Sequence, residues 1–307
     1  MTSVSGDVST RLGEHPLATP LVASCGTVGS VVDFAGVGDL SAYGAAVAKS
    51  VSGSPWEGRK PPRIAATGAG MLNGIGIQNP GVDEWVRKTG PQLSSVPTEV
   101  WGSTVGRDAA EFATVAEKLT AAGVAAIEVN LSCPNLESGR MFALDVAASV
   151  EVVDEVRRAT ELPIGAKLTP NSEDIVSVAA AVAAAGANWV VLGNTVWGAG
   201  FDVATRRPLL SGVVGGYSGT PIKPIALRCV WEVSQALPTL PIVGTGGVTT
   251  GADVVEFFLA GASAVGIGTA HFANPRIGKK ILSQLRRYMN KHGVHRVAEL
   301  IGAAQPW

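Results

Sequence analysis

One pattern recurs three times along the chain: the end of a helix, then a glycine, then a short apolar run that finishes in small or polar residues. It occurs as TAAGVAAIEVN (120–130), AAAGANWVVLGN (183–194) and FLAGASAVGIGT (258–269). A glycine suits the left-handed backbone position that ends a helix. A continuously apolar run suits a parallel strand that is covered on both faces. The repeat therefore predicts helices alternating with buried parallel strands.

The segments before these runs have the periodicity of helices. Apolar residues at the i, i+3, i+4, i+7 spacing of a helix face occur in 107–122, 175–182 and 254–259, and the predicted helix-ending glycines are Gly123, Gly186 and Gly261. We predict Asn171 or Ser172 as the N-cap of the second helix, because side chains of this type accept hydrogen bonds from a first turn.

Eight buried strands are predicted in all, near 21–25, 45–51, 98–103, 125–130, 163–168, 189–193, 241–244 and 265–268. Eight strands alternating with helices favour an α/β fold of the (β/α)8 TIM-barrel type. A doubly wound open sheet is the alternative, but no GxGxxG opens a helix after the first strand. Two long loops, 52–82 and 195–220, are expected to cover the active site of a single domain spanning 1–307.

Composition narrows the class of protein further. The chain has 307 residues, of which 46% are hydrophobic and 16% are charged, which excludes disorder and indicates a large buried core. A net charge of −1 gives no electrostatic footprint for nucleic acid or an anionic membrane. The uncharged stretch 175–201 is long enough to span a bilayer, but Gly186, Asn188 and Asn194 interrupt it. We interpret this stretch as a helix followed by a buried strand.

The three cysteines, Cys25, Cys133 and Cys229, are about a hundred residues apart. This spacing does not suit a local zinc or iron–sulfur site, and the sparse, odd count favours a reducing cytoplasm over a disulfide framework. Cys229 falls in a helical apolar stripe and is predicted to be core, whereas the role of Cys25 stays open. The four histidines share no metal-ligand spacing with carboxylates, so no metal is assigned.

In a barrel, function lies at the C-terminal ends of the strands. Two glycine-rich turns, GTGGV (244–248) and GIGTA (266–270), follow the seventh and eighth predicted strands. Bare backbone N–H groups in these two loops frequently bind phosphate, although tight turns in a glycine-rich chain explain the same letters. The sequence thus predicts an anion site at these turns.

The other strand ends carry lysines, amides and a cysteine. An ammonium inside a barrel is costly unless it is paired, so Lys167 is expected to pair with a bound anion or to act as a Schiff-base nucleophile. Lys49 raises the same question, with a surface lysine as the alternative. Amide side chains can match a flat ring of N–H and C=O groups or simply form turns; the candidates are Asn73, Asn130, Asn135 and Asn194.

Five segments in order resemble the dihydroorotate dehydrogenase family of flavin enzymes. They are GMLNGIGIQNPG (70–81), VNLSCPN (129–135), AKLTPN (166–171), SGTPIKPIALR (218–228) and the pair VGTGGV with GIGTA. The resemblance runs from about Ala18 to Ala273 and implies FMN as cofactor and oxidation of (S)-dihydroorotate to orotate in de novo pyrimidine biosynthesis.

The cysteine in NLSCPN is a point of resemblance to the class 1 enzymes, and the sequence of 70–81 is most similar to that of class 1B catalytic subunits. That resemblance implies a homodimeric core and an electron-transfer partner subunit that carries FAD and a [2Fe–2S] cluster and passes electrons to NAD. It also implies a cytoplasmic location.

The resemblance implies a role for each residue. Cys133 is the general base that removes a proton from C5 of dihydroorotate while a hydride leaves C6 for the flavin. FMN-binding residues are Ser24, Lys49, Ser50, Ser103, Asn130, Lys167, Gly193, Gly219, Gly246, Gly247, Gly268 and Thr269, with the last four at its phosphate. Substrate-binding residues are Lys49, Asn73, Gly74, Ile75, Gly76, Ile77, Asn130, Asn135, Asn194 and Thr195.

Three positions depart from the family pattern. Ser103 stands at the end of the third strand, where the family has an asparagine that contacts flavin. The segment after the catalytic loop lacks the glycine that the family usually has near Ala143, and His271 stands where an asparagine is common. These departures bear on the substrate and the electron acceptor rather than on the fold. Three alternatives stay open for the chain as a whole: another reduced pyrimidine or imide-edged ring as substrate, a Schiff-base aldolase that uses Lys167, and a non-catalytic flavin-binding subunit or scaffold.

Overall fold

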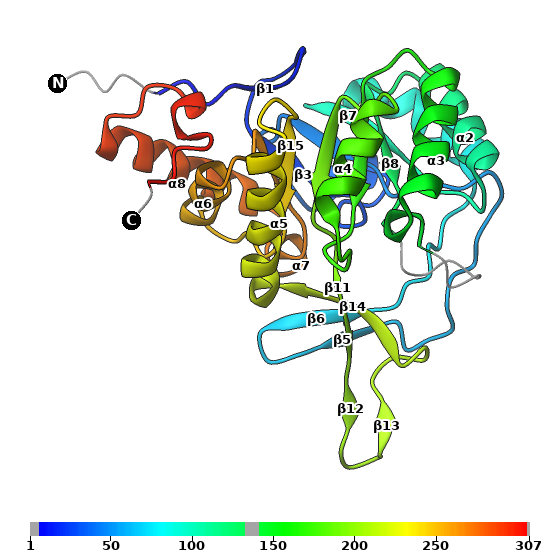
Figure 1. Cartoon of the computed structure of the whole chain (residues 1–307). Coiled ribbons are helices and arrows are strands. Elements are labelled where there is room, and N and C mark those ends of the chain that lie inside the picture. The colour runs from blue at the N-terminus through cyan, green and yellow to red at the C-terminus, as the bar shows by residue number, and fades with distance from the viewer. Residues whose placement is uncertain (1–5, 133–140, 306–307) are drawn as a thin grey trace.

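A computed structural model describes residues 6–132 and 141–305 of the chain, and its centre is a closed barrel of eight parallel strands (Figure 1). The strands are β3 (Leu21–Ala23), β4 (Ala45–Val47), β7 (Glu99–Thr104), β8 (Ala126–Asn130), β9 (Ile164–Leu168), β10 (Trp189–Leu192), β15 (Ile242–Thr245) and β16 (Ala264–Ile267). They pair in the order β10-β15-β16-β3-β4-β7-β8-β9. All eight predicted strands are confirmed, and the alternative of an open sheet is wrong.

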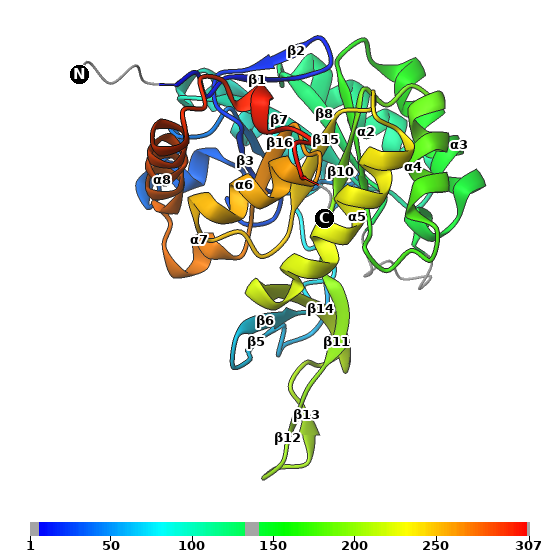
Figure 2. The same ribbon diagram turned by 60° about the vertical axis from the view of Figure 1, so that its left-hand side comes forward.

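Helices surround the barrel (Figure 2). They are α1 (Val82–Thr89), α2 (Ala109–Ala121), α3 (Val146–Ala159), α4 (Ile175–Ala184), α5 (Lys223–Ala236), α6 (Gly251–Leu259), α7 (Ala270–Ala273) and α8 (Ile277–His292). Short 3-10 helices are η1 (Val32–Gly36), η2 (Gly90–Ser95), η3 (Phe142–Leu144), η4 (Thr220–Ile222) and η5 (Val297–Leu300). Within the described ranges, no helix combines the length and the apolar character that a membrane crossing needs.

The predicted helix ends are partly confirmed. Gly123, Gly186 and Gly261 have φ of 90°, 109° and 110°, which a side chain would strain. The predicted N-cap of α4 is wrong: the cap is Asp174, whose carboxylate accepts from the N–H of Ser177. Aspartate is as good an N-cap as asparagine or serine, so residue type alone did not select among three neighbouring candidates.

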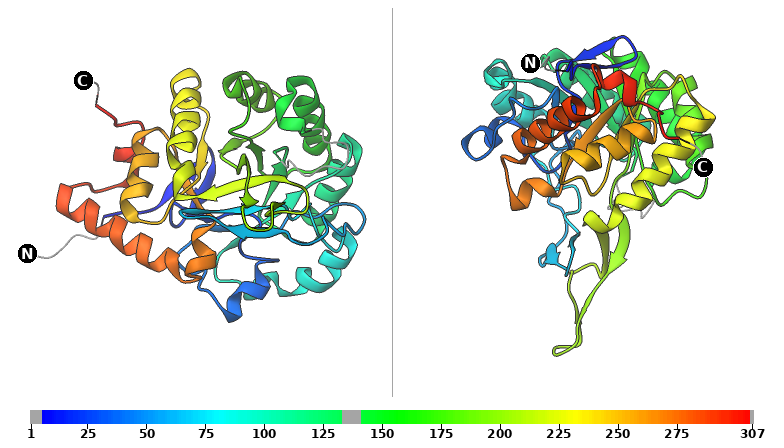
Figure 3. Two further views of the ribbon diagram at one scale, coloured as in Figure 1. Left: turned by 90° about the horizontal axis from the view of Figure 1, so that it is seen from below. Right: turned by 90° about the vertical axis from the view of Figure 1, so that its left-hand side faces the viewer.

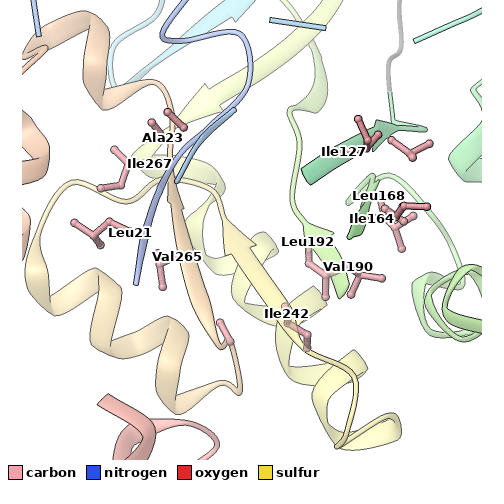
Figure 4. Packing of buried hydrophobic residues seen from close by; sticks show 14 of the residues in the cluster. Leu21, Ala23, Ile127, Ile164, Leu168, Val190, Leu192, Ile242, Val265 and Ile267 are labelled. Carbon is pink, nitrogen blue, oxygen red and sulfur yellow. The ribbon is translucent and has the colours of Figure 1, made fainter. Parts of the chain in front are cut away.

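Two apolar layers follow from the alternation of strand side chains. Outward-facing residues pack between the strands and the helices, as Leu21, Ile127, Val190 and Ile267 do in Figure 4. Inward-facing residues in the N-terminal half of the barrel, including Trp101 and Trp189, fill the lumen. Cys229 is fully buried in the outer layer, as predicted.

A hairpin, β1 (Thr10–Leu12) with β2 (His15–Leu17), lies at the N-terminal end of the barrel. Its Leu12 and Leu17 pack in the lumen cluster, and His15 stacks on Trp189 with ring centroids 5.7 Å apart. His15 Nε2 also lies 2.7 Å from Glu99 Oε2. Since described residues fill and plug this end of the lumen, we expect a ligand to enter from the C-terminal mouth.

The two long segments predicted as loops form a second sheet. Its strands are β5 (Ile64–Ala66), β6 (Gly70–Asn73), β11 (Val196–Ala199) and β14 (Val214–Gly219), in the antiparallel order β11-β14-β6-β5. They follow β4 and β10, so the sheet lies at the mouth end of the barrel (Figure 3, left). A small hairpin, β12 (Phe201–Asp202) with β13 (Arg207–Pro208), extends beyond it (Figure 3, right). The segments do face the mouth, but the expectation that they are loops was wrong.

Candidate functional site

Strand alternation places the predicted FMN-binding side chains inside the barrel mouth. In β8, Ile127 and Val129 join the outer apolar layer, so Glu128 and Asn130 point inward. In β9 the same rule turns Lys167 inward between Ala166 and Leu168. Asn130 and Lys167 are register partners across the β8–β9 pair. An amide and an ammonium therefore lie side by side at the mouth.

A continuous chain of hydrogen bonds crosses this mouth. The Asn130 side-chain NH2 donates to Ser50 Oγ at 3.0 Å, and the Ser132 hydroxyl donates to Asn130 Oδ1 at 3.1 Å. The Asn194 side-chain NH2 in turn donates to Ser132 Oγ at 2.8 Å, and Asn194 Oδ1 accepts from the N–H of Thr195 at 2.8 Å. The structure thus brings together amides from the ends of β8 and β10, which are far apart in sequence.

Ser50 continues this chain to the ends of β3 and β7. Its hydroxyl lies 2.9 Å from Ser103 Oγ and 3.2 Å from Cys25 Sγ, and the Cys25 thiol donates to Ser103 Oγ at 3.6 Å. Ser50 and Ser103 are buried, and Cys25 is half-buried. The sequence left the role of Cys25 open, and the structure shows that its thiol lies at the mouth of the barrel, against Ser50 and Ser103.

Lys167 has a counter-charge inside the barrel. Its Nζ lies 3.5 Å from Glu128 Oε1, and the two side chains are 7% and 3% exposed. The expectation that Lys167 needs a bound anion or a covalent role is therefore incomplete, because Glu128 offsets the cost of burying the ammonium. The prediction missed Glu128 although a carboxylate inside the apolar run AAIEVN is itself a signal.

The predicted phosphate site consists of two turns with unused donors. Residues Gly246, Gly247, Gly268 and Thr269 follow β15 and β16, are half-buried, and donate no backbone hydrogen bond to the described part of the chain. Half-buried N–H groups without acceptors are costly unless a ligand accepts from them. The four donors therefore fit an anion such as a phosphate group.

Side chains hold these turns in place. The Lys223 ammonium donates to Asp253 Oδ1 at 2.6 Å, and the other Asp253 oxygen accepts from the N–H groups of Thr249 and Thr250 at 2.9 and 2.8 Å. Burial by itself raises the pKa of Asp253, but these hydrogen bonds outweigh it and leave that pKa below its usual value. The carboxylate thus stays charged and fixes the turn that follows Gly247.

Glycine is required at two of the predicted positions. Gly193 has φ of 126°, and a Cβ there would lie 1.8 Å from the carbonyl oxygen of Thr245. Gly247 has φ of 72°, and a Cβ there would meet Lys223 Cβ at 2.8 Å and the Gly219 carbonyl oxygen at 3.0 Å. The absence of side chains lets the ends of β10, β14 and β15 approach each other.

The remaining inward-facing residues complete the rim. Ser24 Oγ lies 3.2 Å from Thr245 Oγ1, a residue that the prediction missed, and Thr245 donates to the carbonyl of Gly266. Lys49 makes no ion pair within residues 6–132 and 141–305. It lines a cavity of about 450 Å³ between the loop after β3 and α1.

The predicted substrate residues of the second sheet lie on β6 and the turn after it. Asn73 donates to the Gly216 carbonyl at 3.3 Å, so its amide is engaged with β14. Gly76 and Ile77 both have positive φ, of 72° and 61°. Such a conformation is rare for a β-branched residue and is concentrated at functional sites. Gly74 and Ile75 lie between Asn73 and Gly76, and the Ile75 carbonyl accepts from the N–H of Arg59.

Two further predictions cannot be placed. Cys133 and Asn135 lie outside the described residues, as does most of the loop that carries them. The described chain leads into this loop at Ser132, which is hydrogen bonded to both Asn130 and Asn194. Among the described residues, no group of histidine, cysteine and carboxylate side chains has the arrangement of a metal site.

His271, one of the departures from the family pattern, lies on α7, directly after the turn of Gly268 and Thr269. Its Nδ1 is 2.9 Å from Thr27 Oγ1 and its Nε2 is 2.7 Å from the Tyr43 hydroxyl. Burial lowers the pKa of His271 to about 4, so the ring is neutral at neutral pH. Thr27 donates to the Ser24 carbonyl at 2.8 Å, which ties His271 to the rim.

A closed barrel with a polar mouth, a buried lysine and free backbone donors is typical of barrel enzymes that hold a phosphate-bearing ligand. Comparison with known proteins makes this specific. The profile of the family described as dihydroorotate dehydrogenase matches residues 8–289. The chain belongs to the dihydroorotate dehydrogenase family.

Relatives agree along nearly the whole chain. It is 42% identical over 288 residues to the "Dihydroorotate dehydrogenase B (NAD(+)), catalytic subunit" of Alkaliphilus metalliredigens, covering 94% of this chain and 95% of the relative. The protein of the same description from Desulforudis audaxviator is 43% identical over 290 residues, with 94% of each chain covered.

A solved structure shows the same fold. The crystal structure of the dihydroorotate dehydrogenase of Eimeria tenella in complex with ferulenol superposes with a TM-score of 0.83 at 17% identity, covering 97% of this chain and 88% of that one. The family is FMN-dependent and acts in pyrimidine biosynthesis, and this chain is an enzyme of that kind. The aldolase and non-catalytic alternatives are therefore wrong.

Proposed function

We propose that the chain oxidises (S)-dihydroorotate to orotate as a catalytic subunit, with Cys133 as the base that takes the proton from C5. FMN, when bound, accepts the hydride from C6. The observation that carries the proposal is the set of hydrogen bonds that joins the side chains of Asn130, Ser132 and Asn194. Ser132 is the residue before Cys133 in the sequence. An imide ring presents alternating N–H and C=O groups, and asparagine side chains supply the matching acceptors and donors.

The chain's own residues prepare the substrate for this step. Asn130, Asn194 and Thr195 would hold the pyrimidine ring against the barrel mouth, with Asn135 and the 73–77 turn on its other edges. Lys49 would bind the substrate carboxylate, because its ammonium has no ion-pair partner in the described chain. A base acts only within hydrogen-bonding reach of the proton that it removes, so holding the ring in place is what the amides contribute.

The residues at the mouth fit FMN. The free N–H groups of Gly246, Gly247, Gly268 and Thr269 would hold its phosphate, and Ser24 and Gly219 lie beside these turns. Lys167, with Ser50, Asn130 and Gly193, would lie against the ring system, with Ser103 hydrogen bonded behind Ser50. A fixed ammonium there stabilises the negative charge that develops on reduction. The Lys167–Glu128 pair keeps that charge in position inside the barrel.

The partner subunit, the oligomeric state and the location are proposals that go beyond membership of the family. The relatives are catalytic subunits by description, and we propose a partner subunit with FAD and a [2Fe–2S] cluster, a homodimer of this single-domain chain, and a cytoplasmic location. Exposed apolar side chains on the second sheet and its hairpin support a protein interface there; Trp197, Phe201 and Val203 are 49%, 61% and 92% exposed.

The test is the visible spectrum of the FMN-loaded chain under anaerobic conditions, before and after addition of dihydroorotate. We expect the flavin absorbance to bleach within seconds. The Cys133→Ala variant should bind FMN as tightly as the wild type and bleach at least about 100-fold more slowly, which is the typical contribution of a positioned base. A wild-type spectrum that does not change refutes the substrate, and a fully active variant refutes the base.

A further inference from the structure

Cys25, Ser50 and Ser103 form a closed ring of hydrogen-bonding side chains at the ends of β3, β4 and β7. The three edges measure 3.2 Å (Cys25–Ser50), 2.9 Å (Ser50–Ser103) and 3.6 Å (Cys25–Ser103). These three residues are separated by up to 78 positions in sequence. They meet only because β3, β4 and β7 are neighbours in the barrel.

Counting hydrogens determines the direction of each bond in this ring. The Cys25 thiol donates to Ser103, and Ser50 Oγ already accepts from the Asn130 amide. If Ser50 also donated to Ser103, the Ser103 hydroxyl hydrogen would have no acceptor in the described part of the chain, although this residue is 1% exposed. Buried hydroxyls are rarely left unsatisfied. Every hydrogen is used only if Ser103 donates to Ser50 and Ser50 donates to Cys25.

With one lone pair of Ser50 accepting from Ser103, the ring leaves the other lone pair for the Asn130 amide. With Ser50 as acceptor, the NH2 group of Asn130 faces Ser50, and its Oδ1 faces the hydroxyl of Ser132. An amide can flip by exchanging these two groups, and the flipped form would place the amide oxygen against Ser50 Oγ, whose hydrogen is donated to Cys25. The amide is thereby fixed in one orientation, with one N–H and one lone pair left for a ligand.

We propose that Cys25 and Ser103 are positioning residues, which act through Ser50 to hold the Asn130 amide in the orientation that binds FMN and substrate. The proposal rests on the role of Asn130 in the proposed function. It also gives a role to Ser103, where the family pattern has an asparagine, because the Ser103 hydroxyl accepts from the Cys25 thiol and lies 2.9 Å from Ser50 Oγ.

The test compares variants of Cys25 by FMN affinity, from the quenching of flavin fluorescence, and by KM and kcat for dihydroorotate. We expect Cys25→Ala to raise the Kd of FMN and the KM about 10-fold, the effect of losing one such bond, with a smaller change in kcat. Cys25→Ser keeps a donor and an acceptor and should restore most of the affinity. Cys229→Ala, a buried cysteine in α5, is the matched control and should leave both constants unchanged.

A double variant separates positioning from direct contact. In an Asn130→Ala background, Cys25→Ala should change the Kd of FMN less than about 2-fold, because coupled residues are not additive. A full 10-fold effect in that background overturns the proposal, as do equal losses in Cys25→Ser and Cys25→Ala. If Cys25→Ala does not fold, Ser103→Ala removes the same ring and must give the same losses. Failure of dihydroorotate to reduce the flavin would refute the proposed function and leave the FMN affinities to decide this proposal.

Discussion

His271 should make the stability of the protein depend on pH in a way that a single substitution removes. The Thr27 hydroxyl donates to the Ser24 carbonyl, so its oxygen accepts from Nδ1–H of the histidine. Burial raises the pKa of Tyr43 well above its usual value, so the phenol stays protonated and donates to Nε2. The folded protein thus holds the neutral ring, and protonation would break the bond from Tyr43.

The size of the effect follows from the two pKa values. Burial lowers the pKa of His271 from 6.5 to about 4 in the folded protein, so the unfolded chain binds more protons between these two pH values. The contribution is fully present above pH 6.5 and is lost as the pH falls toward 4. A difference of about 2.5 pH units, at about 1.4 kcal/mol per unit, corresponds to about 3 kcal/mol.

The assay is urea unfolding of the FMN-loaded protein at several pH values from 4 to 8, with His271→Asn beside the wild type. Asparagine does not titrate, and because it is smaller than histidine and fills less of the buried site, the variant should be less stable at pH 7. Its deficit in unfolding free energy should shrink by about 3 kcal/mol as the pH falls to 4. His292→Asn, at an exposed position of α8, is the control for replacing a histidine outside the core. A constant deficit for His271→Asn would refute the buried neutral ring.

Two further predictions concern the mouth of the barrel. Lys167→Met leaves the Glu128 carboxylate buried without its counter-charge and should cost about 3 kcal/mol of stability. Adding Glu128→Gln to this variant should recover the melting temperature but not FMN binding. A Lys167→Met variant as stable as the wild type would contradict the ion pair. Gly247→Ala forces a side chain into a left-handed conformation against Lys223 and should weaken FMN binding at least about 10-fold, measured by fluorescence titration. Gly68→Ala, which meets nothing within 4 Å, should bind FMN normally, and equal affinities of the two glycine variants would refute the fit at the turn.

Several features of the site were within reach of the sequence because they depend on local order. Lys167 and Asn130 were expected at the mouth because each ends an apolar run, and the ends of parallel strands meet at one edge of a barrel. The glycine turns were expected at the phosphate site because residues 246–247 and 268–269 follow two consecutive strands. These inferences need only the period of each strand and the position of its last residue.

The second sheet was missed for a physical reason. Strands β6 and β14 are GMLN and VGGYSG, which have neither a continuous apolar run nor a regular alternation. They pair with each other across 143 positions (Gly216 with Asn73) to 149 positions (Gly219 with Gly70) of sequence, so their stability comes from the partner and not from their own propensity. Neither segment by itself distinguishes a strand from a glycine-rich loop.

What the sequence determined by itself is therefore the barrel, the order of its strands along the chain and the residue that ends each one, because periodicity and helix-ending glycines are local properties. Only the tertiary structure decided which of those ends touch. The ring of Cys25, Ser50 and Ser103 and the pairing of Lys167 with Glu128 join strands that are distant in sequence. Closure of the barrel brings their side chains within hydrogen-bonding distance, and no local pattern encodes that distance.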